Sequence, residues 1–193
     1  MEQEIKQKEN KILDFFITTL NGMAFGLFAT LIVGTIIGSI GSLFTSFAPE
    51  TSKVLKDTST LLSCLTGAGI GIGVALCLKM DTLKTIVIAS IGEISSYFSL
   101  TTKFVSDGTT INTFKIGDPL TIYIVVIISC LLIKLIFQKK TPVDILLIPL
   151  CGIIIGLIFS ILIRYPTIYV TFGIQYIVNE ATLIQPILMG III

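Results

Sequence analysis

The chain has 193 residues, of which 53% are hydrophobic and only 13% are charged, and its formal net charge is +1. A mean hydropathy of +0.99 lies far outside the range of soluble domains and predicts an integral membrane protein. The near-neutral charge argues against nucleic acid as a partner, and the complete lack of histidine argues against an enzyme, a metal site or a bound cofactor.

The N-terminal part of the sequence predicts a surface segment followed by a long span. Residues 1–14 alternate acids and bases, with apolar side chains at roughly helical spacing. They predict either a short amphipathic helix on the membrane surface or a frayed, disordered terminus. Residues 15–44 are apolar and exceed the ~20 residues that cross a bilayer, which predicts one tilted span, or a surface turn followed by one. The whole of residues 15–193 is expected to be the membrane-embedded domain.

Four further spans are expected after a polar loop at residues 45–59. They cover residues 60–78, 83–100, 119–137 and 144–163. Pro149 interrupts the last of these spans early, and Arg164, Tyr165 and Pro166 are expected to close it. Residues 167–182 are too polar for a lipid-facing span and too apolar for a free loop, which predicts a re-entrant or interfacial segment.

The last apolar run begins at Leu183, and the sequence stops inside it at Ile193. Because a half-span cannot satisfy its backbone in lipid, we expect a longer protein or a partner chain to complete it. The expected fold class is all-α, a polytopic membrane helix bundle of about five to six transmembrane segments with a re-entrant or broken-helix region. Lysines gather on the side of the N-terminus, so the positive-inside rule favours a cytoplasmic N-terminus in the cell membrane.

Glycines four residues apart recur in the predicted spans. The pairs are Gly22 with Gly26, Gly34 with Gly38, Gly67 with Gly71, Gly69 with Gly73, and Gly152 with Gly156. Such pairs let helix backbones approach closely in lipid, and they permit a homodimer. Glycine is also common in membrane helices in general, which accounts for some of the pairs. The run "TGAGIGIGVAL" lacks the preceding strand and the following acidic residue of a nucleotide-binding motif, so nucleotide binding is not expected.

Glu93 lies near the middle of the span predicted at residues 83–100, where an unpaired carboxylate costs about 2.5–3.5 kcal/mol. Ser90 and Tyr97 lie three and four residues away on the same helix face. This stripe predicts either a solvated cavity or a hydrogen-bond node between helices. We favour the cavity, because ionisable residues inside membranes are functional by default.

A second polar cluster precedes a proline near the C-terminal end. It consists of Asn179, Glu180, Thr182 and Gln185, and Pro186 follows it. The polar run and the proline together predict a discontinuous helix, whose terminus can point at a substrate as in many transporters. An ordinary helix cap at the membrane surface is the alternative.

The triplet Gly117-Asp118-Pro119 precedes the span predicted at residues 119–137. Asp118 is a favoured N-cap residue, Pro119 suits the first helical position, and Gly117 permits a sharp entry. The triplet is therefore first a structural motif, and Asp118 is only second a candidate site residue.

The order of these motifs is similar to that of a known family. The segments "IGDPLTIYIVVIISCLLIKLIFQKKTPVDILLIPLCGIIIGLI" and "NEATLIQPILMGIII" resemble the phosphotransferase-system enzyme IIC-like membrane family that includes the perfringolysin regulator protein. "LNGMAFGLF" and "IGVALCLKMDTLKTIVIASIG" resemble earlier segments of the same domain. The strongest matches are the Gly-Asp-Pro triplet, Pro142 with Asp144, and Gln185 with Pro186. Members usually continue further, so the chain resembles a truncated member.

The resemblance implies a permease-like protein that transports a sugar-like small polar solute, often as a homodimer. Under this resemblance the candidate substrate-binding residues are Glu93, Asp118, Asn179, Glu180 and Gln185. The alternative function is a membrane-embedded regulator or sensor that scaffolds a partner protein. It is suggested by the lack of energising chemistry and by the family's regulator member. The expected partners are membrane lipid, the solute and a second copy of the chain.

Overall fold

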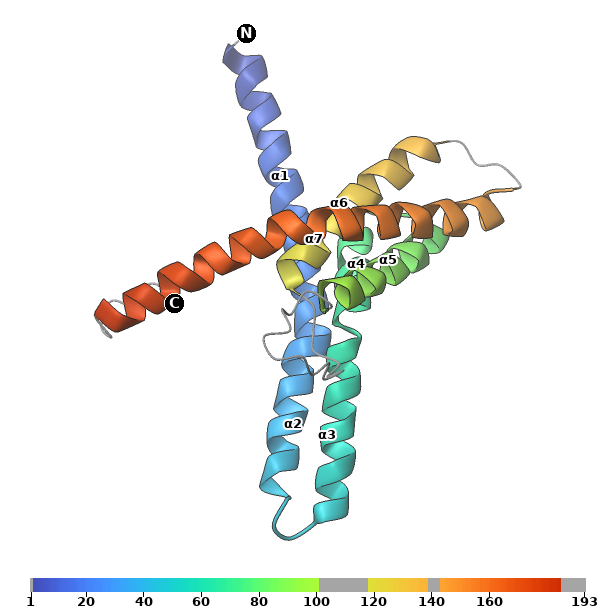
Figure 1. Ribbon diagram of the computed structural model, residues 1–193. Helices are drawn as coiled ribbons and strands as arrows, with labels where there is room; N and C mark the ends of the chain where they lie inside the picture. Colours follow the sequence, from blue (N-terminus) through green and yellow to red (C-terminus); the bar gives the residue numbers. More distant parts are fainter. Residues whose placement is uncertain (1, 101–117, 139–142, 185–193) are drawn as a thin grey trace.

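The structure is a computed structural model that describes residues 2–100, 118–138 and 143–184. Every regular element in these ranges is helical, which confirms the predicted all-α fold class (Figure 1). The elements are α1 (Glu2–Leu27), the π-helical turn η1 (Phe28–Ile32), α2 (Val33–Leu43), α3 (Pro49–Cys64), α4 (Thr66–Cys77), α5 (Thr82–Leu100), α6 (Pro119–Ile136) and α7 (Asp144–Ile184).

The first three elements form one long helix that the π-helical turn η1 interrupts only locally. The part between Lys11 and Leu43 is long and apolar enough to cross a membrane, in agreement with the predicted span. α1 begins at Glu2, so the charged N-terminal residues continue directly into this span. A π-helical turn accommodates wider hydrogen-bond spacing inside an otherwise regular helix.

The predicted loop at residues 45–59 is wrong for most of its length, because α3 begins at Pro49. Proline is favoured at the first helical position, and Glu50 in the first turn interacts favourably with the helix dipole. α3 also gains a packing partner. A Cβ at Gly38 of α2 would lie 2.6 Å from the Ser59 hydroxyl oxygen, so the two helices approach closely. Polar composition therefore did not prevent a helix here, because α2 offers a small-residue face.

The predicted span at residues 60–78 is a bent pair of helices. α3 and α4 meet at Leu65, and their axes differ by 48°. Three helices in the described ranges are long and apolar enough to span a membrane, or four if this bent pair counts as one. The three are the segment Lys11–Leu43, α6, and the segment Asp144–Thr167 of α7. The sequence had predicted the broken-helix region elsewhere, at residues 167–186, and did not predict the bend at Leu65.

One glycine face of α4 brings it against α1. Gly69 and Gly73 of α4 lie against Gly26 and Gly22 of α1. A Cβ at Gly22 would lie 2.6 Å from the Gly73 carbonyl oxygen and 2.8 Å from the Val74 Cα. Backbone therefore touches backbone, as the glycine spacing predicts.

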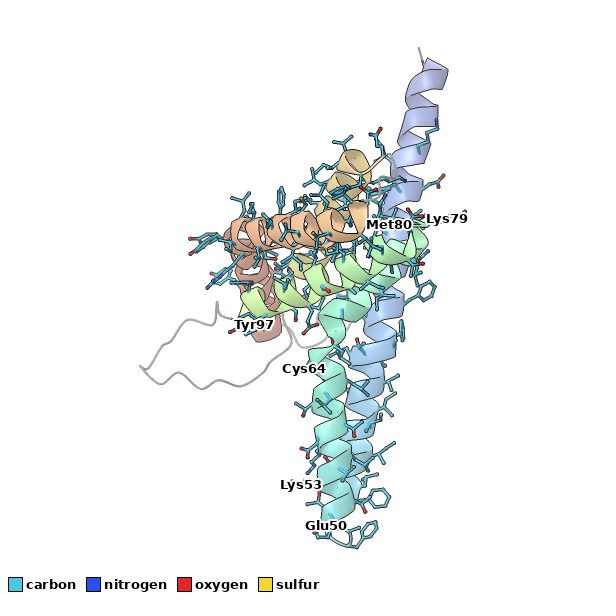
Figure 2. The ribbon with its side chains drawn as sticks, turned by 90° about the vertical axis from the view of Figure 1, so that its right-hand side faces the viewer. Glu50, Lys53, Cys64, Lys79, Met80 and Tyr97 are labelled. Carbon is cyan, nitrogen blue, oxygen red and sulfur yellow. The ribbon has the colours of Figure 1, made fainter. Side chains whose placement is uncertain are left out.

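The opposite glycine face of α4 packs against α5. A Cβ at Gly71 would lie 2.9 Å from the Cα of Ala89, and one at Gly67 would clash with the backbone of Gly92. α4 is consequently held between α1 and α5, and its buried Ile70 and Val74 join the hydrophobic core. That core continues through Val87, Ile88 and Ile91 of α5 and Ile122, Val125, Val126, Cys130 and Ile133 of α6. The hairpin of α2 and α3 extends away from this body (Figures 1 and 2).

α7 continues through Pro166 to Ile184, but its part that is long and apolar enough to span a membrane is Asp144–Thr167, which agrees with the predicted end of the span at residues 164–166. Residues 167–182, predicted as a re-entrant or interfacial segment, are the second part of the same helix. Pro166 has no N–H to donate to the carbonyl oxygen four residues earlier, that of Leu162. The Thr167 hydroxyl donates to the carbonyl oxygen of the next residue, Ile163, at 2.8 Å.

Candidate functional site

The junction of α3 and α4 leaves polar backbone groups that need partners. Leu65 is both the C-cap of α3 and the N-cap of α4, and its apolar side chain makes no capping hydrogen bond. The first N–H groups of any helix have no partner within that helix. A partner for the start of α4 must therefore come from another element.

Glu93 of α5 supplies this partner. Its Oε2 accepts a hydrogen bond from the backbone N–H of Ala68, in the first turn of α4, at 3.1 Å. The carboxylate thus lies at the positive end of the α4 dipole, where negative charge is stabilised. Glu93 is partly buried. Among the described residues, its second oxygen, Oε1, accepts no hydrogen bond. The helix-to-helix node that the sequence offered as one alternative is therefore present, and one carboxylate oxygen stays available.

The π-helical turn η1 lies beside the same junction. The Thr30 hydroxyl oxygen of η1 is 3.3 Å from that of Thr66, the first residue of α4, and both side chains are buried. Thr66 in turn donates to the Ser63 carbonyl oxygen at 2.8 Å, and Thr30 donates to that of Gly26 at 2.8 Å. Two irregular helix segments thus face each other here, and π-helical turns are frequent at functional sites. We call Thr30, Ser63, Thr66 and Glu93, with the Ala68 N–H, the junction cluster.

The rest of the predicted stripe on α5 faces outward. Ser90 is exposed and its hydroxyl donates to the Ile86 carbonyl oxygen at 3.2 Å, while Tyr97 is 56% exposed at the far end of the helix (Figure 2). Ser96 is instead the buried polar neighbour, and it faces Gly67 at the start of α4. Sequence reasoning missed Ser96 and Thr30 because single hydroxyl residues in apolar helices carry no local signal.

Asp118 is the N-cap of α6, and Pro119 occupies the first helical position, as predicted. The backbone N–H of Ile122 donates to the Asp118 carbonyl oxygen at 3.2 Å. The side chain makes no capping bond to the α6 backbone. Its Oδ2 accepts a hydrogen bond from the Thr121 hydroxyl at 2.9 Å. Gly117 lies outside the described residues, and a role of Asp118 in solute binding stays a prediction.

The C-terminal polar cluster is only partly described. Asn179 and Glu180 belong to the last part of α7, and the description there covers their backbone and not their side chains. Gln185 and Pro186 lie outside the described residues. Their predicted roles in binding and in breaking a helix stay predictions.

Long apolar helices, backbone contacts between glycines and a helix broken beside a carboxylate define a polytopic helical membrane protein. Residues 17–193 match the family described as Phosphotransferase system, EIIC, and the chain belongs to this family. At the family level it is therefore a permease-like component of sugar transport across a membrane. The match does not distinguish a perfringolysin regulator branch. Neither the comparison with curated proteins nor that with solved structures gave a match.

Proposed function

We propose that the chain binds a small polar, sugar-like solute for transport at the junction cluster, with Glu93 as the principal contact. The observation that carries this proposal is the hydrogen bond between Glu93 Oε2 and the Ala68 N–H at a broken helix. Transporters commonly build solute sites from discontinuous helices whose termini point at the bound molecule.

The chemistry of the junction cluster suits a polyhydroxy solute. Each sugar hydroxyl can donate one hydrogen bond and accept others. Glu93 Oε1 can accept from such a hydroxyl, and a charge-assisted hydrogen bond of this kind is stronger than a neutral one. The hydroxyls of Thr30 and Thr66 already donate to the carbonyl oxygens of Gly26 and Ser63, so toward a solute hydroxyl their oxygens act as further acceptors.

Several finer features belong to the same proposal. The further solute contacts that we propose are Asp118, Asn179, Glu180 and Gln185. We also propose that the protein assembles as a homodimer and that its N-terminus lies in the cytoplasm. The sequence pattern and the family membership support these points. The alternative role as a regulator or sensor stays a prediction without an observation of its own.

The test is a thermal-stability panel on the purified protein in detergent, with sugars, polyols and carboxylates as probes. A solute at a hundredfold excess over its Kd stabilises the folded state by about 2.7 kcal/mol. Glu93→Gln keeps an amide oxygen that can accept from the Ala68 N–H, but it removes the charge. We expect the Glu93→Gln protein to fold and to lose most of the sugar-induced shift in Tm.

The matched control is Glu50→Gln, which makes the same change in the first turn of α3 at the tip of the hairpin (Figure 2). This variant should keep the full shift. A panel that leaves the wild-type Tm unchanged would contradict the proposal. An equal shift in Glu93→Gln would also contradict it.

A further inference from the structure

The hairpin of α2 and α3 is attached to the rest of the molecule at its base. α1, α4, α5, α6 and α7 pack against one another and form the body, in which glycine contacts hold α4 between α1 and α5. In the part of the chain that the structure describes, neither α2 nor α3 packs against α5, α6 or α7. The hairpin, which we call the arm, therefore projects from the body (Figures 1 and 2).

The two helices of the arm are held together along their length. A Cβ at Gly41 of α2 would lie 2.9 Å from the Cβ of Leu55, and one at Gly34 would lie 3.2 Å from the Ser59 carbonyl oxygen. At the tip, the hydroxyl oxygens of Thr45 and Ser52 are 3.1 Å apart. Because close-packed groups cannot shift past one another freely, these contacts make the arm one rigid unit.

The chain passes between the body and the arm twice, and both passages are irregular. It enters the arm through the π-helical turn η1 and leaves it at Leu65, where α3 and α4 meet at an angle of 48°. Leu65 has a φ of −79° and a ψ of 3°, and this ψ departs from that of a regular α-helix. Sharp bends in helices occur at π-helical turns and similar irregularities. The two passages are therefore the places where the backbone bends most easily.

The two irregular passages lie side by side. The hydroxyl oxygens of Thr30 in η1 and Thr66 at the start of α4 are 3.3 Å apart. On the body side, the hydrogen bond from the Ala68 N–H to Glu93 Oε2 fixes the first turn of α4 to α5. On the arm side, the Leu65 side chain makes no capping hydrogen bond. A single axis through both passages therefore separates the arm from the body.

We propose that η1 and Leu65 together form a hinge, about which the arm moves as a rigid unit relative to the body. Hinges in proteins are a few residues at the ends of elements that absorb a change in φ and ψ, while the packed units on either side keep their internal contacts. Thr30 and Thr66 belong to the junction cluster, but the hinge does not require that a solute binds there.

The length of the arm makes this motion measurable. α3 has 16 residues, which corresponds to a helix about 24 Å long. A rotation of about 20° at the base, the size of a sharp helix kink, would move the tip by about 8 Å.

The test measures distances between pairs of spin labels by pulsed electron paramagnetic resonance, in the full chain in detergent without added solute. The labels are attached to single cysteines introduced at exposed positions, after alanine has replaced the four native cysteines. The arm-to-body pair is Val54→Cys with Leu146→Cys. The matched reference pairs are Leu43→Cys with Leu61→Cys within the arm, and Tyr97→Cys with Leu146→Cys within the body.

We expect the arm-to-body distances to spread over about 8 Å, as worked out from the arm length, and both reference pairs to give narrow distributions. An arm-to-body distribution as narrow as those of the references would overturn the proposal. An equally broad distribution within the arm would also overturn it, because the arm would then not be a rigid unit.

Hydrogen exchange on the unmodified chain is a second test, which needs no substitution. Hinge bending opens backbone hydrogen bonds locally, and such local opening exposes amides to exchange. The amides of residues 28–32 should therefore exchange faster than those of residues 20–26 and 34–40, in the regular helices on either side. Equal or slower exchange at residues 28–32 would contradict the hinge.

Discussion

The contact between α1 and α4 gives a sharp prediction for Gly22→Ala. The added Cβ would lie 2.6 Å from the Gly73 carbonyl oxygen, whereas ordinary contact begins at 3.4 Å. The backbones of α1 and α4 must therefore separate by about 0.8 Å, because no flexible side chain can move aside. Overpacking of this kind costs about 1–3 kcal/mol.

Gly173→Ala provides the matched control, since a Cβ at Gly173 of α7 meets nothing within 4 Å. Both variants gain the helix propensity of alanine over glycine, about 0.8–1.0 kcal/mol. The difference between them therefore isolates the packing cost. In thermal unfolding in detergent, Gly173→Ala should raise Tm. Gly22→Ala should lie below Gly173→Ala by about 2–4 °C for each kcal/mol of overpacking. Equal Tm values for the two variants would refute the close approach of α1 and α4.

Three further predictions concern single residues. Lys79 has a φ of 52° in the turn after α4, so Lys79→Gly should stabilise the fold by about 1 kcal/mol; a lower Tm would contradict this. The Tyr123 hydroxyl lies 2.9 Å from that of Thr19. Tyr123→Phe should therefore lower the free energy of unfolding in detergent by about 0.6–1.7 kcal/mol, and an unchanged free energy of unfolding would show that this contact is dispensable. Lys84 donates to the Phe137 carbonyl oxygen at the end of α6, so Lys84→Met should cost about 0.3–1 kcal/mol, with Lys84→Arg nearer to wild type in the same assay.

Local patterns predicted most of the helical segments correctly. Hydropathy summed over about 20 residues located the long N-terminal span and α6, because lipid demands a continuous apolar helix whatever surrounds it. The start of α6 at Asp118 and Pro119 was predicted from capping preferences, which depend only on neighbouring residues. The glycine spacing likewise indicated close backbone contacts, which α4 makes on both sides.

One misplaced boundary has its cause in tertiary packing. Residues 49–59 were predicted as a loop from their polar composition, yet α2 provides a small-residue face on which they form a helix. In α7 the membrane-length apolar part ends at Thr167, close to the predicted residues 164–166, although the helix itself continues through Pro166 to Ile184.

The sequence by itself determined that this is an all-α membrane protein, because its hydropathy demands long apolar helices. Its resemblance to the enzyme IIC-like family depended on the order of the quoted motifs. The cost of an unpaired carboxylate in lipid singled out Glu93 but left open whether it lines a cavity or bonds to a partner on another helix. Only the tertiary structure decided what the partner is: the N–H of Ala68, exposed where α3 and α4 bend at Leu65. The two groups are 25 residues apart. A hydrogen bond across that separation depends on how α4 and α5 pack, which no local pattern encodes.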